Sequence, residues 1–140
     1  MQVKDIMTSE LFTLTPQATL QDAHSLSREH GIRHIPVVDL LTGKFIAVVT
    51  QKALVSKVMS LATRFPQSQL AEQEKSIPIS EVYVLDCDTV QADQPLLEIA
   101  EYFLNYKHGC LPVVDDDNKL VGIVTSSDFV KLAISLLKQR

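Results

Sequence analysis

Apolar and polar positions in residues 111–128 predict two strands joined by a turn and followed by a helix. The apolar run 111–114 carries Pro112 near its start, where a strand tolerates proline. The polar cluster 115–118 consists of Asp and Asn, which favour tight turns. A second apolar run, 120–124, leads into Thr and Ser residues that precede an apolar-periodic segment and so indicate the start of a helix.

The same pattern occurs twice in the chain. Pro36 in Ile-Pro-Val-Val-Asp and Pro112 in Leu-Pro-Val-Val-Asp lie 76 residues apart (112 − 36). After the turn the offset becomes 75, because the first turn is one residue longer, and Thr50 then corresponds to Thr125. Matching residues at a nearly constant offset indicate an internal repeat.

Each copy is predicted to add a strand and a helix before this motif and a helix after it. In the first copy we expect strands at 12–15, 35–38 and 44–49 and helices at 19–30, ended by Gly31, and 51–61. In the second we expect strands at 89–90, 111–114 and 120–124, a helix with Pro95 as its first residue, and a helix at 128–138 that buries Phe129, Leu132, Ala133 and Leu136. The polar stretch 63–76 is expected to be a connector with a helical turn at 70–75.

Composition and charge narrow the possible functions. A chain of 140 residues with 46% hydrophobic and 21% charged residues is an ordinary globular protein. A net charge of −4 argues against a nucleic-acid partner. No apolar run is long enough for a bilayer, and the N-terminal segment lacks the apolar region of a signal peptide. Cys87 and Cys110 are too few for a disulfide framework, so we expect a cytoplasmic protein without membrane contact.

The residues that could carry chemistry do not form a catalytic or metal-binding pattern. The sequence has no nucleophile–base motif, P-loop or dinucleotide fingerprint. Its four histidines include one i, i+4 pair, which Gly31 interrupts, and they lack further ligands; they are His24, His30, His34 and His108. We therefore expect no enzyme activity, no metal and no obligatory cofactor.

The order strand, helix, strand, strand, helix, the Pro-Val-Val-Asp motif and the Gly-Ile-Val-Thr-Ser-Ser-Asp motif at 122–128 resemble the CBS (cystathionine β-synthase) domain. Two copies in tandem resemble a CBS pair, or Bateman module. The resemblance places the first repeat at 3–60, a connector at 61–77 and the second repeat at 78–138. It implies an α/β (α+β) fold in which two pseudo-symmetric β-α-β-β-α repeats pack as one module.

Many members of this family bind adenine nucleotides in clefts between the repeats, so the resemblance implies a non-catalytic regulatory module for AMP, ADP or ATP. Thr125 and Asp128 would line the cleft, and the Asp128 carboxylate would accept hydrogen bonds from the ribose hydroxyls. The first copy has Ala47 and Ala53 where the second has Gly122 and Asp128. The resemblance therefore implies one intact and one degraded cleft, with the glycine permitting close approach in the intact one.

The pseudo-symmetry of such modules implies further ligand contacts. Ile32, Arg33 and His34 would line the intact cleft, with Arg33 or His34 beside a phosphate. The backbone around Met7 and Thr8 and the side chain of Ile123 are the candidate contacts of the adenine.

Two interpretations of Asp128 are compatible with the sequence: a ligand-binding acid and a helix-capping acid. The acid could only cap the final helix, in which case it would contribute about 0.3–1 kcal/mol to stability. The chain would then be a ligand-free scaffold that dimerises and regulates a partner protein. The resemblance implies a homodimer in either case, because these modules commonly pair through their helices. The sequence does not specify the nucleotide, the partner or the geometry of the dimer.

Overall fold

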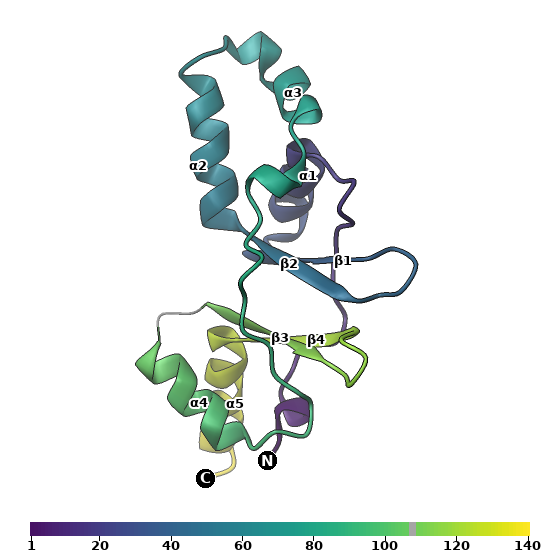
Figure 1. Cartoon of the computed structure of the whole chain (residues 1–140). Coiled ribbons are helices and arrows are strands. Elements are labelled where there is room, and N and C mark those ends of the chain that lie inside the picture. The colour runs from purple at the N-terminus through teal and green to yellow at the C-terminus, as the bar shows by residue number, and fades with distance from the viewer. Residues whose placement is uncertain (107–108) are drawn as a thin grey trace. The chain divides into compact units, whose positions relative to one another are not determined.

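The computed structural model describes residues 1–106 and 109–140 (Figure 1). The described residues form a mixed α/β fold, as predicted, and contain five α-helices and two small antiparallel sheets. They divide into a central unit, Phe12–Cys87, and a C-terminal unit, Asp88–Arg140 together with Met1–Leu11. The first eleven residues thus pack with the second copy of the repeat. The expectation for His108 falls outside the described residues.

The central unit contains a two-stranded sheet and three α-helices. Its elements are α1 (Leu20–His30), β1 (His34–Val38), β2 (Phe45–Thr50), α2 (Gln51–Ala62), α3 (Gln67–Ser76) and the 3-10 helix η2 (Ile79–Glu81). β1 and β2 are antiparallel, with Pro36 opposite Val48. The strand predicted at 12–15 is reduced to one bridge, in which Leu14 lies parallel to Val37.

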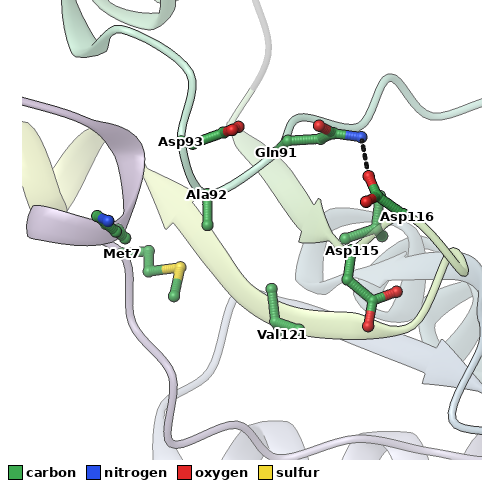
Figure 2. A pocket seen from close by; sticks show the side chains of 9 residues that line it. Met7, Gln91, Ala92, Asp93, Asp115, Asp116 and Val121 are labelled. Atoms are coloured by element: carbon green, nitrogen blue, oxygen red, sulfur yellow. Dashed lines mark hydrogen bonds between the residues drawn. The ribbon is translucent and has the colours of Figure 1, made fainter.

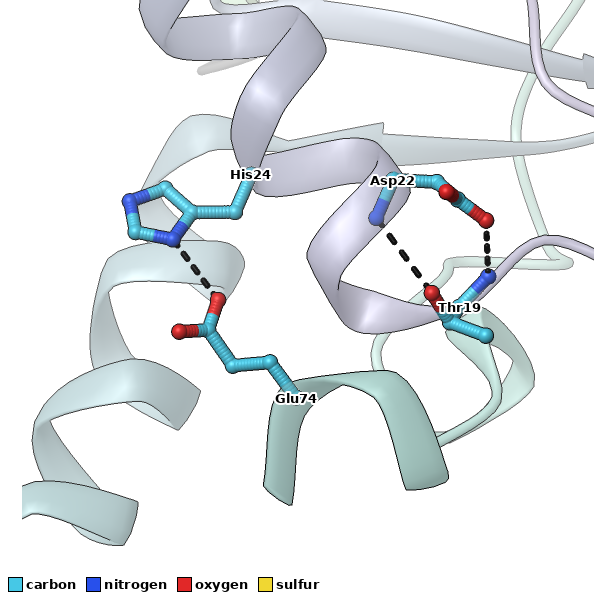
Figure 3. Close-up of polar contacts among 4 residues, drawn as sticks. All are labelled: Thr19, Asp22, His24 and Glu74. Atoms are coloured by element: carbon cyan, nitrogen blue, oxygen red, sulfur yellow. Dashed lines mark hydrogen bonds and ion pairs between the residues drawn. The ribbon is translucent and has the colours of Figure 1, made fainter. Parts of the chain in front are cut away.

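The ends of α1 follow from its sequence. Thr19 caps the N-terminus: its Oγ1 accepts from the backbone N of Asp22 at 3.3 Å, and its own N donates to Asp22 Oδ2 at 2.9 Å (Figure 3). Gly31 ends the helix in the left-handed conformation at φ 64°, as predicted. The helix buries Leu20 and Ala23 in the core of this unit.

Helix α3 is longer than the helical turn predicted for the connector. Its sequence is mostly polar, but Leu70 packs on the core and the Glu74 residue is only 7% exposed. Glu74 Oε1 lies 2.7 Å from His24 Nδ1 of α1, an ion-pair or hydrogen-bond contact between the two helices (Figure 3). A contact that joins residues 50 positions apart leaves no periodic signal, so the sequence could not predict the full helix.

The C-terminal unit repeats the order helix, strand, strand, helix of the central unit, and its described residues hold no counterpart of α3. Its elements are the 3-10 helix η1 (Val3–Asp5), α4 (Leu96–Asn105), β3 (Cys110–Val114), β4 (Leu120–Thr125) and α5 (Ser126–Lys138). β3 and β4 are antiparallel, with Pro112 opposite Ile123. Thr8 bridges Ile123 on one side of this hairpin and Val90 bridges Val113 on the other, the latter in place of the strand predicted at 89–90.

Two predictions for the helices of this unit were wrong. Pro95 is the N-cap of α4 and not its first helical residue. Ala133 and Leu136 of α5 are exposed, and Phe129 and Leu132 are only half-buried, because the unit covers only the first part of the apolar face of α5. Within the described residues, no helix combines the length and apolar character that a membrane span requires.

Candidate functional site

Asp128 lies at the corner where β4 ends and α5 begins. Thr125 is the N-cap of α5 and Asp128 is the third helical residue, so the carboxylate turns back toward Thr125. Asp128 Oδ2 accepts from the backbone N of Thr125 at 2.8 Å and lies 3.4 Å from Thr125 Oγ1. One oxygen of the carboxylate therefore caps the helix, as the alternative reading of the sequence proposed.

The other oxygen of Asp128 contacts the N-terminal segment. Thr8 Oγ1 donates to Asp128 Oδ1 at 3.1 Å across 120 positions of sequence. Two backbone hydrogen bonds hold Thr8, from its N to the Ile123 carbonyl and from the Ile123 N to its carbonyl, each 2.9 Å. Thr8 is exposed, whereas Asp128 is only 5% exposed. The fold thus brings together four predicted site residues, and the backbone N of Thr8 is already donated within the protein.

The absence of a side chain at Gly122 leaves space for the N-terminal segment around Met7 and Thr8. A Cβ at this position would lie 2.7 Å from Met7 Sδ and 3.1 Å from the Thr8 carbonyl oxygen. The expectation that this glycine serves the approach of a ligand is therefore replaced by a structural role, because the segment around Met7 and Thr8 occupies the space. Ile123, which follows Gly122, is buried.

The corresponding corner of the central unit lacks the threonine and the aspartate that form the contact between Thr8 and Asp128. Val84 stands where the C-terminal unit has Thr8 (84 − 8 = 76) and bridges Val48 through hydrogen bonds of 2.8 and 3.1 Å. Thr50 Oγ1 accepts from the backbone N of Ala53 at 3.1 Å, so the hydroxyl alone caps α2. This corner offers neither a carboxylate nor a hydroxyl at the two equivalent positions.

Ile32, Arg33 and His34 belong to the central unit. The Arg33 carbonyl accepts from the backbone N of Gln51, the first residue of α2, at 2.7 Å, and His34 lies opposite Thr50 in the sheet. Arg33 is exposed and Ile32 is half-buried. Their contribution to a site around Asp128 stays a prediction of the family resemblance.

Burial, and then the charge of Arg33, lower the pKa of His34 below its ordinary value of 6.5. The lowered pKa favours the neutral form of the imidazole at pH 7. Of the two residues proposed to meet a phosphate, only Arg33 carries a full positive charge there.

The lowered pKa of His34 predicts acid sensitivity. Below about pH 6.5 the unfolded chain binds a proton that the folded chain binds less readily, so stability falls as the pH falls, by up to about 1.4 kcal/mol per pH unit. His34→Gln should remove this part of the dependence. Urea denaturation of both proteins at pH 7.5 and 5.5 measures it, and equal losses of stability in the two would contradict the prediction.

A pocket of about 420 Å³ lies in the C-terminal unit, and its lining does not include Thr125 or Asp128 (Figure 2). Apolar side chains, including those of Met7, Ala92 and Val121, form part of its lining. Its polar lining residues are Lys4, Gln91, Asp93, Asp115 and Asp116, and Gln91 donates to Asp116 at 3.4 Å. Three carboxylates against one ammonium group disfavour a phosphate, so this pocket does not suit a nucleotide. Except for Met7, its residues were not predicted as site residues.

The described residues contain no group of three His, Cys, Asp or Glu side chains that could hold a metal ion.

Comparison with known proteins identifies the repeat. The family model for the CBS domain matches residues 3–60 and 75–135. The crystal structure of a Vibrio cholerae protein with a provisional assignment to acetoin utilization (AcuB) superposes with a TM-score of 0.81 at 38% identity, covering 99% of this chain and 93% of that one.

Two similar structures contain adenosine compounds. CBSX2 from Arabidopsis thaliana in complex with AMP has a TM-score of 0.79 at 26% identity, covering 96% of this chain and 97% of that one. The CBS domain pair of protein MJ0100, in complex with 5′-methylthioadenosine and S-adenosyl-L-methionine, has a TM-score of 0.75 at 28% identity, with the same coverage.

Several curated relatives are much longer than this chain. The chain spans between 23% and 46% of the length of four of them, at 26–29% identity. Some of these relatives are named as enzymes, among them an L-aspartate semialdehyde sulfurtransferase of Methanocaldococcus jannaschii.

Proposed function

The chain belongs to the CBS domain family, and from this premise we propose that it is a regulatory module that binds one adenine nucleotide around Thr125 and Asp128. The observation that carries the proposal is the Asp128 carboxylate at the first turn of α5, together with its absence from the equivalent corner at Ala53. The complexes of similar CBS pairs with AMP and with adenosyl compounds support an adenosine ligand.

Different residues are proposed to contact the ribose, the phosphates and the adenine of the nucleotide. Asp128 accepts from a ribose hydroxyl through Oδ1, because Oδ2 is engaged by the Thr125 backbone. The backbone N–H groups at the start of α5 and the guanidinium of Arg33 serve the phosphates. Ile123, Ile32 and the segment around Met7 serve the adenine. A positive Arg33 beside a neutral His34 favours AMP, ADP or ATP over a ligand with a cationic sulfonium group.

Isothermal titration calorimetry tests the proposal. The purified protein is titrated with AMP, ADP, ATP, S-adenosylmethionine and NAD at up to millimolar concentration. We expect a phosphorylated adenosine to bind and S-adenosylmethionine to bind more weakly. Absence of binding by all five would leave the ligand-free scaffold, the second candidate, which the capping bond of Asp128 Oδ2 to the Thr125 backbone favours.

The chain itself is proposed to be non-catalytic. CBS pairs are generally regulatory modules, and the enzyme names among the relatives belong to proteins of which this chain spans only a part. The similarity to AcuB supports acetoin utilization as the process in which a regulated partner acts. Growth on acetoin of a Vibrio cholerae strain that lacks AcuB and expresses this chain tests that assignment.

We also propose that the module is a homodimer. Apolar side chains on α5 remain exposed at helical spacing, namely Val130 at 59%, Ile134 at 47% and Leu137 at 69%. A second copy of the chain that packs on this stripe in a closed two-fold contact removes these apolar side chains from water. Light scattering should give twice the 15.6 kDa of one chain, and the mass of one chain at micromolar concentration would contradict the proposal.

A further inference from the structure

The hydroxyl of Thr8 and the carboxylate of Asp128 occur together in one unit and are absent together from the other. In the C-terminal unit Thr8 Oγ1 donates to Asp128 Oδ1 at 3.1 Å. The equivalent residues of the central unit are Val84 and Ala53, while the backbone bridge is the same in both. The hydroxyl is therefore not required to build this bridge, and its partner is the acid.

The two carboxylate oxygens of Asp128 have different hydrogen-bond donors. Oδ2 accepts from the backbone N of Thr125 at 2.8 Å and so satisfies one of the free N–H groups at the start of α5. Oδ1 has the Thr8 hydroxyl as its donor. Asp128 is only 5% exposed, so a ribose hydroxyl that reaches Oδ1 and leaves the helix cap intact has to share this acceptor with the Thr8 hydroxyl or take its place.

The contact between Thr8 and Asp128 can be exchanged at low cost. Thr8 is exposed, and 3.1 Å lies beyond the usual range of about 2.5–3.0 Å for an O–H···O hydrogen bond. Rotation of the Thr8 side chain to another staggered position moves the hydroxyl away. The backbone of Thr8 stays fixed during this rotation, because its N and carbonyl are both bonded to Ile123.

We propose that the Thr8 hydroxyl is displaced from Asp128 Oδ1 when the nucleotide binds, so that Thr8 sets the affinity of the site. A ribose hydroxyl takes over the acceptor that Thr8 leaves. The inference rests on the proposed function, since it concerns the same carboxylate. Thr8 acts here as a positioning residue: in the free protein it holds the carboxylate, and the ligand gains only the difference between two hydrogen bonds.

Thr8→Val removes the competitor and keeps the shape of the side chain. We expect this variant to bind the nucleotide roughly twofold to tenfold more tightly than the unmodified protein. Thr8→Ser retains the hydroxyl and should restore the original affinity. Val84→Thr, the matched change in the central unit, should leave the affinity unchanged. Calorimetry with AMP and ATP measures all four proteins.

Two further measurements identify the exchanged atom. With 2′,3′-dideoxy-ATP, which lacks both ribose hydroxyls, Thr8→Val should show no gain in affinity. Without ligand, Thr8→Val should lower the melting temperature, because a buried carboxylate oxygen loses its donor, and it should lower it less in a chain that also carries Asp128→Ala.

The outcomes separate the two proposals. Failure of both the unmodified protein and Thr8→Val to bind any of the nucleotides overturns the proposed function and the exchange together. Binding by the unmodified protein with equal or weaker binding by Thr8→Val overturns the exchange alone. An equal gain with the dideoxy ligand would also overturn it, because the gain would then not involve the ribose hydroxyls.

Discussion

Asp128→Ala should lower the affinity for an adenine nucleotide by up to about a hundredfold. A hydrogen bond to a charged acceptor contributes about 1.5–3 kcal/mol, and about 1.4 kcal/mol corresponds to one decade of affinity. The value counts one ribose hydroxyl, because Asp128 Oδ2 is engaged by the Thr125 backbone in the free protein. It is an upper limit, because the bond from the ribose replaces the one from Thr8. Calorimetry of the variant with the best ligand of the unmodified protein measures the loss.

Asp22→Ala is the matched control for this change. Asp22 is also the acid of a capping box, accepting from the backbone N of Thr19 at 2.9 Å at the start of α1. Its removal should cost about 0.3–1 kcal/mol of stability, as for an exposed first-turn acid, and leave nucleotide affinity intact. Unchanged affinity in Asp128→Ala, or an equal loss in Asp22→Ala, would remove Asp128 from the site.

Asp128→Ala should also cost more stability than the sequence suggested. The sequence predicts the contribution of a surface acid, but the structure buries this carboxylate and gives it donors from Thr125 and Thr8. Leaving those donors without their acceptor costs about 1–3 kcal/mol. Affinity is therefore to be measured below the melting transition of the variant, which circular dichroism determines.

Gly122→Val should destabilise the C-terminal unit by about 1–3 kcal/mol or more and abolish nucleotide binding. The first added carbon would already lie 2.7 Å from Met7 Sδ and 3.1 Å from the Thr8 carbonyl oxygen, and valine adds two more. The segment that holds Thr8 over Asp128 must then move. Urea denaturation measures the loss of stability, and calorimetry measures the loss of binding.

The smaller change Gly122→Ala, alone and combined with Met7→Ala, distinguishes the contact with Met7 from the contact with the Thr8 carbonyl oxygen. Met7→Ala in the same chain removes the nearest atom, a flexible side chain, and should restore much of the stability. The contact with the Thr8 carbonyl oxygen remains, so recovery should be incomplete. Ala47, buried at the equivalent position of the central unit, indicates that a methyl group is compatible with this strand position where its surroundings allow it. A Gly122→Val protein as stable as the unmodified one would contradict the account of this glycine.

The repeated motif made the fold predictable because it fixes both hairpins and the helices beside them. The burial of Leu96 and Ile99 in α4 and the cap at Thr19 in α1 are features of local sequence. Helix α3 and the exposed end of α5 depend on which surfaces other elements cover, and no local pattern records that. The pairing of Glu74 with His24 is an example.

The sequence proposed residues for the candidate site but not the contacts among them. The motif at 122–128 singled out Thr125 and Asp128. The bond from Thr8 to Asp128 and the fit of Met7 against Gly122 join segments more than 110 residues apart, so only the fold reveals them. These contacts change the roles assigned to two residues. Gly122 leaves space for the N-terminal segment of the chain, and Thr8 contacts Asp128 through its side chain, whereas the sequence predicted a contact through the Thr8 backbone.

The stoichiometry of nucleotide binding to the unmodified protein tests the central claim most directly. Calorimetric titration should give one adenine nucleotide per chain, because the corner at Asp128 has the acid and the corner at Ala53 does not. The same titration of Asp128→Ala should show that this single site is lost or severely weakened. Two equivalent sites per chain, or a single site that keeps its affinity without Asp128, would contradict the account.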